Sequence, residues 1–401
     1  MTPRRARFRA TREQVLAFRL ASNRLARRLP PGSLLAAAAC GIQETPHGTA
    51  PLALAARVEG LTPHEVERAL AGNRTLLAVW AMRGAPHLVP AGDAEVFTAG
   101  ALPADEVSFA AFLGGWAAPV VAAGVPAATL AERLAAAART ALDGRRLLVD
   151  DLRVELWRRV PELAGVRRPP GARADMPEPL FRTIGLAGVA CIAGGVGDRA
   201  ELVRTDQWLP RPPPAADPER ARAELVRRYL HCHGPSTPGA FAEWTLRGPA
   251  DAREAFALVD GELVEVDSDG RRTFLLAADA DALAGPPTAE GVRLLPTQDP
   301  FLQQRDRATL LPDPSLRRRL WRPVGGPGLL LLAGRPAGTW GWTAARGRLR
   351  VTVEPFGSLP ATARGAVQAE AERLAPFRGA TTAEVTVPAQ RSPVPAPRPQ
   401  P

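Results

Sequence analysis

Residues 76–90 read Leu-Leu-Ala-Val-Trp-Ala-Met-Arg-Gly-Ala-Pro-His-Leu-Val-Pro, and this stretch decides the fold that the sequence predicts. It contains two apolar runs, at 76–82 and 88–89, that are joined across Arg83-Gly84-Ala85-Pro86. Apolar runs separated by a few residues that include glycine and proline are typical of a β-hairpin. The stretch therefore predicts two antiparallel strands with a tight connection.

The residues before this hairpin have helical patterns. Residues 12–29 carry a rough apolar stripe at helical spacing, 52–58 form a second helical stretch, and a short helix is expected from Leu34. Thr62 followed by Glu65 is a capping box that opens a further helix through residue 71. Three or four helices followed by a two-stranded hairpin correspond to the winged-helix plan.

The same order of elements recurs twice, and a different pattern follows. The expected helices of the second copy are 105–113, 128–142, 150–160 and 179–190, with a strand at 201–204. The third copy has expected helices at 218–230, 237–244 and 250–257 and hairpin strands at 258–266 and 272–276. After residue 286, short strands are expected at 292–295, 328–332, 338–342, 349–353 and 384–387, with one helix near 362–374.

The predicted fold class is α+β, with tandem winged-helix domains followed by a small C-terminal β-barrel-like domain. The expected domains are a basic arm (1–11), winged helix 1 (12–102), winged helix 2 (103–209), a Pro-rich linker (210–216), winged helix 3 (217–285), the β-barrel-like domain (286–389) and a Pro-rich disordered tail (390–401).

Composition indicates a globular protein with a polyanionic partner. The 401 residues are 46% hydrophobic and 23% charged, which is compatible with sizeable cores and argues against wholesale disorder. All 51 basic residues are arginine, a bias typical of a GC-rich genome. Their placement is more informative, because residues 1–29 hold nine arginines and one acid, or +8 of the net charge of +10. A basic arm and first helix indicate nucleic acid as the partner. These arginines are Arg4, Arg5, Arg7, Arg9, Arg12, Arg19, Arg24, Arg27 and Arg28.

The chain has no convincing export signal or membrane span. The basic N-terminal region is too long for a signal peptide, and the apolar run that follows it is too short. Residues 107–131 lack charge, but they are mostly Ala, Gly, Val and Pro, so buried helix ends are expected there. Cys40, Cys191 and Cys232 are widely spaced and are not expected to form a disulfide framework. A soluble cytoplasmic protein is expected.

Three motifs carry a family resemblance. They are Gly-Ile-Gln-Glu-Thr-Pro at 41–46 leading into 52–57, the hairpin segment 80–90, and Leu-Leu-Pro-Thr-Gln-Asp-Pro-Phe at 294–301 followed by 334–340 and 351–356. Together they resemble the bacterial winged-helix DNA-binding family that includes DNA glycosylases acting on alkylated or crosslinked bases, in collinear order from about residue 12 to 387. The resemblance implies three tandem winged helices and a C-terminal β-barrel that form a C-shaped clamp around duplex DNA.

The resemblance also implies a catalytic motif. In the glycosylases of that family, a glutamine and, two residues later, a glutamine or aspartate hold the water that attacks the sugar carbon. Gln43 matches the first position, whereas Thr45 stands at the second and offers a hydroxyl of shorter reach. Glu44 is the ionisable alternative, as a general base or a stabiliser of oxocarbenium charge, if the loop turns it inward. Read without the family, Gln43 caps a helix end or joins a loop hydrogen-bond network.

The candidate DNA-binding residues are cationic. The polar strip 303–307, Gln-Gln-Arg-Asp-Arg, is a further candidate to face the DNA channel. Arg83 and His87 lie at the expected wing, where a cation reaches phosphate or the minor groove; the alternative for His87 is a hydrogen bond inside the fold. The other candidates are Arg4, Arg5, Arg7 and Arg9 in the arm, and Arg317, Arg318 and Arg319 near Trp321, for which a solvated helix face is the alternative.

No metal or cofactor site is predicted. His231-Cys232-His233 lacks a second ligand cluster, and the glycines at 194–197 lack the lysine of a phosphate-binding loop. The expected partner is double-stranded DNA, bound by a monomer at the nucleoid, with no membrane and no small-molecule cofactor. The first hypothesis is a DNA glycosylase that hydrolyses the N-glycosidic bond of alkylated or crosslinked bases. The alternatives are a non-catalytic duplex-binding protein (a regulator or a lesion-shielding factor), which the Thr45 departure favours, and a winged-helix module that binds protein.

Overall fold

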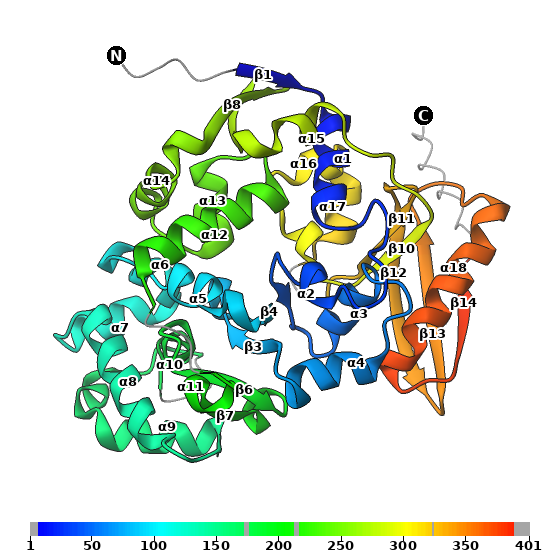
Figure 1. Cartoon of the computed structure of the whole chain (residues 1–401). Helices are drawn as coiled ribbons and strands as arrows, with labels where there is room; N and C mark the ends of the chain where they lie inside the picture. The colour runs from blue at the N-terminus through cyan, green and yellow to red at the C-terminus, as the bar shows by residue number, and fades with distance from the viewer. Residues whose placement is uncertain (1–6, 172–175, 212–215, 323–324, 389–401) are drawn as a thin grey trace, which may run out of the picture.

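The computed structural model describes residues 7–171, 176–211, 216–322 and 325–388. They form a mixed α+β structure with three sheets (Figure 1), which confirms the predicted fold class at this level. The sheets have the strand orders β2-β4-β3-β6-β7-β5, β1-β8-β9 and β10-β11-β12-β13-β14.

The hairpin predicted at 76–90 is confirmed. It consists of β3 (Leu76–Trp80) and β4 (Pro86–Pro90), which pair antiparallel. The short strand β2 (Ile42–Gln43) adds to the edge of β4, with Gln43 opposite His87. The first motif and the hairpin therefore meet at one sheet edge. The other strands of this antiparallel sheet are β6 (Ala190–Gly194), β7 (Glu201–Arg204) and β5 (Leu147–Leu148).

The first helices are α1 (Arg12–Ser22), α2 (Leu34–Ala37), α3 (Thr49–Ala55), α4 (Pro63–Glu67) and α5 (Ala94–Phe97). The capping box of Thr62 and Glu65 is present at the start of α4, as predicted. Helix α1 ends earlier than the predicted residue 29. Its C-cap Asn23 donates from Nδ2 to the carbonyl oxygens of Arg19 and Cys232, and Arg24 then adopts a left-handed φ of 58°. This contact to a distant helix turns the chain away from the helical path.

A second group of helices covers the far half of the six-stranded sheet. Their apolar faces form one core around Leu134, Leu152 and Phe181. The helices are α6 (Glu106–Leu113), α7 (Ala117–Ala122), α8 (Ala127–Ala141), α9 (Val149–Arg159), α10 (Glu178–Leu186) and α11 (Thr205–Trp208).

No single helix among the described residues is long and apolar enough to cross a membrane; only the pair 91–101 and 106–122, bent by 103°, passes that test together.

The third group carries its own hairpin, β8 (Leu263–Ser268) and β9 (Arg271–Leu276). Strand β1 (Arg7–Ala10) pairs parallel with β8, so part of the expected basic arm is a strand. Strand β8 begins later than predicted because a short 3-10 turn, Asp260–Glu262, precedes it. The helices of this group are α12 (Pro218–His233), α13 (Pro238–Thr245), α14 (Pro249–Ala257) and α15 (Ala280–Ala284).

The C-terminal region is a five-stranded sheet, as the short apolar runs predict. Helix α18 (Ala361–Leu374) packs on it through Val367, Ala371 and Leu374 (Figure 1). Helix α16 (Arg307–Leu310) contacts both α1 and helix α17 (Pro314–Leu320). The strands are β10 (Val292–Leu295), β11 (Gly328–Leu332), β12 (Arg335–Ala345), β13 (Arg348–Pro355) and β14 (Thr382–Thr386).

The cysteine prediction is wrong in one respect. Cys40 and Cys232 form a disulfide across 192 residues of sequence, because the segment before β2 packs against the end of α12. Cys191 is free and buried. The disulfide therefore ties the chain just before Gln43 to the third helical group.

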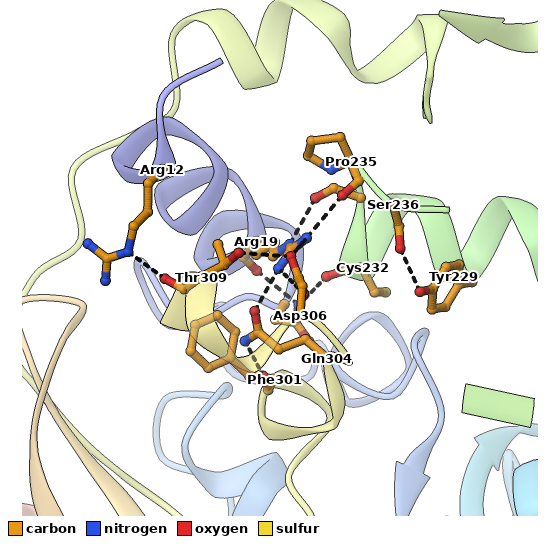
Figure 2. A network of polar contacts seen from close by, with 12 residues as sticks. Arg12, Arg19, Tyr229, Cys232, Pro235, Ser236, Phe301, Gln304, Asp306 and Thr309 are labelled. Atoms are coloured by element: carbon orange, nitrogen blue, oxygen red, sulfur yellow. Dashed lines mark hydrogen bonds and ion pairs between the residues drawn. The ribbon is translucent and has the colours of Figure 1, made fainter. Parts of the chain in front are cut away.

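The interpretation of the N-terminal charge as a local cationic surface needs correction. Arg19 is buried and donates to Gln304, Asp306 and the backbone carbonyls of Gly234 and Pro235 (Figure 2). Arg12 donates to the carbonyls of residues 309 and 310. Arg27 and Arg28 pair with Glu290 and Glu370, and Arg9 lies 3.6 Å from Asp267. Much of this charge therefore joins distant parts of the chain.

Candidate active site: a glutamine and arginine cluster beside a basic pocket

Gln43 is the centre of a polar cluster that joins three segments. Its side-chain Oε1 accepts from Arg83 Nη2 at 2.6 Å and from Gln303 Nε2 at 2.9 Å. Arg83 Nη2 also donates to Gln303 Oε1 at 2.9 Å. Gln303 ends a 3-10 turn (Pro300–Gln303) that lies 260 residues further along the chain. These bonds fix the orientation of the Gln43 amide, whose Nε2 has no acceptor among the described residues.

Arg83 holds this cluster from the turn between β3 and β4. It adopts a left-handed φ of 60°, and its Nη1 donates to the carbonyl oxygen of Trp244 in α13 at 2.6 Å. Burial and the positive charge of Arg305 lower the pKa of Arg83 to about 9. The hairpin position of Arg83 predicts a cation that reaches DNA, whereas in the structure its guanidinium bonds Gln43.

His87 forms a hydrogen bond inside the fold, which is the alternative to a DNA contact at this position. It is buried, and its Nδ1 lies 2.8 Å from the carbonyl oxygen of Ala85. Burial and the charge of Arg83 lower the pKa of His87 to about 3, so the imidazole is neutral at physiological pH. A neutral buried ring is not a phosphate contact.

The acid stability of the protein tests this assignment. His233, in α12, is also buried, and burial and the nearby Arg19 lower its pKa to about 3. Both histidines have an ordinary pKa of 6.5 in the unfolded chain, which therefore binds two more protons than the folded protein at pH 5. The stabilisation is complete above pH 6.5 and is lost as the pH falls toward 3, at about 1.4 kcal/mol per pH unit for each histidine.

We expect the urea midpoint to fall steeply between pH 6.5 and pH 4, and His87→Gln to remove about half of the slope that the two histidines cause. A midpoint that does not depend on pH in this range contradicts the neutral burial of both rings.

Glu44 points toward the start of α3. Its Oε1 accepts from the backbone N–H of Gly48 at 2.6 Å, and its Oε2 accepts from the backbone N–H of Ala50 at 2.7 Å. The Nδ1 of His47 lies 3.1 Å from Oε1. A carboxylate that caps a helix N-terminus satisfies otherwise unpaired N–H groups and the helix dipole. The loop therefore does not turn Glu44 inward as the base hypothesis required, whereas Thr45 is exposed and lines a pocket.

This pocket has a volume of about 630 Å³, and we call it the Gln43 pocket because Arg83 and Gln303 in its lining bond the buried Gln43, which does not itself line it. Among the described residues, its lining includes four arginines and no aspartate or glutamate. One wall is apolar, where Trp321 donates from Nε1 to the carbonyl of Leu302 at 3.1 Å and the Arg307 guanidinium lies 5.0 Å from its ring centre. Such a surface favours an anion that also carries a flat apolar group. The lining residues are Thr45, Pro46, Arg83, Thr297, Gln298, Leu302, Gln303, Arg305, Arg307, Leu320, Trp321, Arg322, Gly325, Gly326 and Pro327.

The remaining candidates lie outside this pocket. On α17, Arg317 donates to the carbonyls of residues 311 and 312, and Arg319 donates to that of Pro355 and lies over the Phe356 ring. Arg318 is on the same helix, and Arg7 and Arg9 are in β1. Arg4 and Arg5 lie outside the described residues. Within the described part of the chain, no group of three or more His, Cys, Asp or Glu side chains is placed to hold a metal ion.

A buried ion pair connects the two segments that carry Gln43 and Gln303. Arg57, just after α3, donates to both carboxylate oxygens of Asp299 at 2.7 and 2.8 Å, and both side chains are almost fully buried. Asp299 also accepts from the backbone N–H of Phe301, at the start of the turn that ends at Gln303. The pair therefore joins the segment after Gln43 to the segment that carries Gln303.

The site combines an ordered neutral amide with a basic pocket, on a fold with several helix and hairpin units. These features are typical of a DNA-binding hydrolase. A family model described as DNA glycosylase AlkZ-like matches residues 36–377, and the chain belongs to this family. The interstrand DNA cross-link repair glycosylase of Streptomyces sahachiroi is 27% identical over 396 residues, which cover 95% of this chain and 100% of the relative. The solved structure of Streptomyces sahachiroi DNA glycosylase AlkZ matches with a TM-score of 0.73 and 26% identity, over 95% of this chain and 100% of that one. The predicted family and its DNA glycosylase function are confirmed.

Proposed function

We propose that this protein is a monofunctional glycosylase that hydrolyses the N-glycosidic bond of alkylated or crosslinked bases in duplex DNA, with Gln43 positioning the water. The observation that carries the proposal is the Gln43 amide, fixed by Arg83 and Gln303 beside a pocket whose described lining residues include four arginines and no carboxylate. The activity for which the Streptomyces relative is named, repair of interstrand DNA cross-links, supports this class of substrate.

The contacts of Gln43 limit its chemical role. Both lone pairs of Oε1 already accept hydrogen bonds, so only Nε2 is left to hold a water molecule. The amide thus orients the water by donation and does not take its proton. Positioning suits a base that carries positive charge, because the leaving group then departs with the bonding electrons without prior protonation. The water oxygen adds to the sugar carbon, and its proton passes to solvent or to the departing base.

We infer a path for the duplex from the order of the helix groups. The three helix groups with their hairpins would act as winged helices 12–102, 103–209 and 217–285, and the sheet region 286–389 would close a monomeric clamp on nucleoid DNA. In this arrangement Arg83 bridges the first hairpin and α13 of the third group.

Base release is the direct test. We expect the purified protein to convert a duplex containing N7-alkylguanine into abasic DNA, seen as strand breaks after hot alkali and absent without the protein. Tight binding of the same duplex without abasic sites would instead support the second candidate, a non-catalytic duplex-binding protein. The observation that favours this candidate is Thr45, which replaces the second motif residue and leaves the site without an obvious proton acceptor.

A further inference from the structure

Arg305 is a partly buried cation that has no partner among the described residues. Its Nε is fully buried and has no hydrogen-bond acceptor, and its guanidinium forms no hydrogen bond or ion pair with the described residues. The residues on either side of it, Gln304 and Asp306, form hydrogen bonds with other groups. Asp306 accepts from Arg19 at 2.8 and 2.9 Å, and Gln304 bonds both Arg19 and the carbonyl oxygen of Phe301 (Figure 2).

The surrounding charges do not neutralise the positive charge of Arg305. Burial and the positive charge of Arg307 lower the pKa of Arg305, and the smaller effects of Glu243 and Tyr229 oppose them. Arg83 and Arg322, on the same pocket, already donate to protein oxygens, and Arg307 is exposed over Trp321. A desolvated guanidinium is costly unless an anion or acceptor meets it. Among the described lining residues, Arg305 therefore has the strongest need for an anionic ligand.

Arg305 also lies where two cavities meet. Besides the Gln43 pocket, it lines a second cavity of about 570 Å³, which we call the α13 pocket. The α13 pocket is formed by the first turn of α13, the end of the β8–β9 hairpin and the segment 305–312. Its lining is mixed in charge, with Arg12, Arg271 and Arg272 beside Glu243, Asp269 and Asp306. A small anion would satisfy Arg305 alone. A polymer with a charge at each unit would satisfy Arg305 and continue into both cavities.

We propose that Arg305 binds a phosphodiester of the strand that carries the attacked nucleotide, at the point where that strand passes from the Gln43 pocket to the α13 pocket. The guanidinium fork matches two phosphate oxygens, which a lysine or a single amide does not. This inference rests on the proposed function, because it assumes that the Gln43 pocket receives the damaged nucleotide. It makes Arg305 a positioning residue that sets the register of the strand.

Two matched variants test the proposal in the full-length protein. Arg305→Gln removes the partly buried cation and keeps a polar side chain, and Arg364→Gln removes the same charge from the exposed face of α18. Affinity for an N7-alkylguanine duplex is measured at several salt concentrations. We expect the slope of log affinity against log salt to become shallower by about 1 for Arg305→Gln and to stay unchanged for Arg364→Gln. Thermal melting confirms that each variant is folded.

A phosphate scan locates the contact. Single methylphosphonates, which are uncharged, replace each phosphate on both sides of the damaged nucleotide. We expect one position to weaken wild-type binding about tenfold or more and to have no further effect in Arg305→Gln. Equal losses for wild type and variant at every position, or an unchanged salt slope, would overturn the proposal. If the wild-type protein neither binds nor processes the duplex, the proposed function itself fails, which is a separate result.

Discussion

Replacing Gln43 by alanine is expected to slow the release of an alkylated base by at least about 100-fold, the scale on which a positioned proton-transfer or water-orienting group acts. The variant loses the side chain that the proposed mechanism uses to hold the water by donation from Nε2. Affinity for the duplex should change little, because the arginines that line the Gln43 pocket remain. Single-turnover measurement of abasic sites on N7-alkylguanine DNA separates this chemical step from binding.

Glu44→Gln is the matched control for Gln43→Ala. Glu44 caps α3 through Gly48 and Ala50, so its replacement should lower the melting temperature and leave the rate of base release nearly unchanged. The opposite result, a large loss of rate for Glu44→Gln and none for Gln43→Ala, would show that a carboxylate is the catalytic group and that the loop rearranges when DNA binds.

The local parts of the fold were predictable because short sequence patterns determine them. The apolar runs at 76–90 specify the hairpin, and Thr62 with Glu65 specifies a helix start, since each pattern acts over a few residues. Contacts between distant segments were not predictable. The Cys40–Cys232 disulfide spans 192 residues, and Asn23 ends α1 early through a carbonyl of α12. The spacing of residues within a short segment does not show which distant segments will pack against each other.

The same limit applies to the candidate site. Gln43 was found through the resemblance, but its bond to Gln303 depends on a contact across 260 residues. The basic character of the pocket depends on which arginines lack acidic partners, and a count of charges along the sequence does not reveal this. Arg19 is counted in the basic N-terminal region but pairs with Asp306, and that pairing leaves Arg305 without its neighbouring acid.

Replacing Asp299 by alanine should be the most destabilising single change near the site, because it leaves the buried Arg57 without its counter-ion. Removing one partner of a buried ion pair costs about 3–5 kcal/mol of unfolding free energy. The loss should also slow base release, since Asp299 holds the start of the turn that ends at Gln303. Urea unfolding followed by circular dichroism measures the first effect.

Two further variants test whether the unpaired charge causes this loss of stability. Glu384→Gln breaks the exposed pair with Arg348 on the C-terminal sheet, and it should cost less than about 1 kcal/mol. The double variant Arg57→Met/Asp299→Leu removes both buried charges, and it should recover much of the stability lost in Asp299→Ala, because the penalty comes from the unpaired charge. Recovery of stability without recovery of rate would show that this pair is present to position Gln303. A double variant as unstable as Asp299→Ala would instead mean that the packing and hydrogen bonds of Asp299, and not its charge, hold the two segments together.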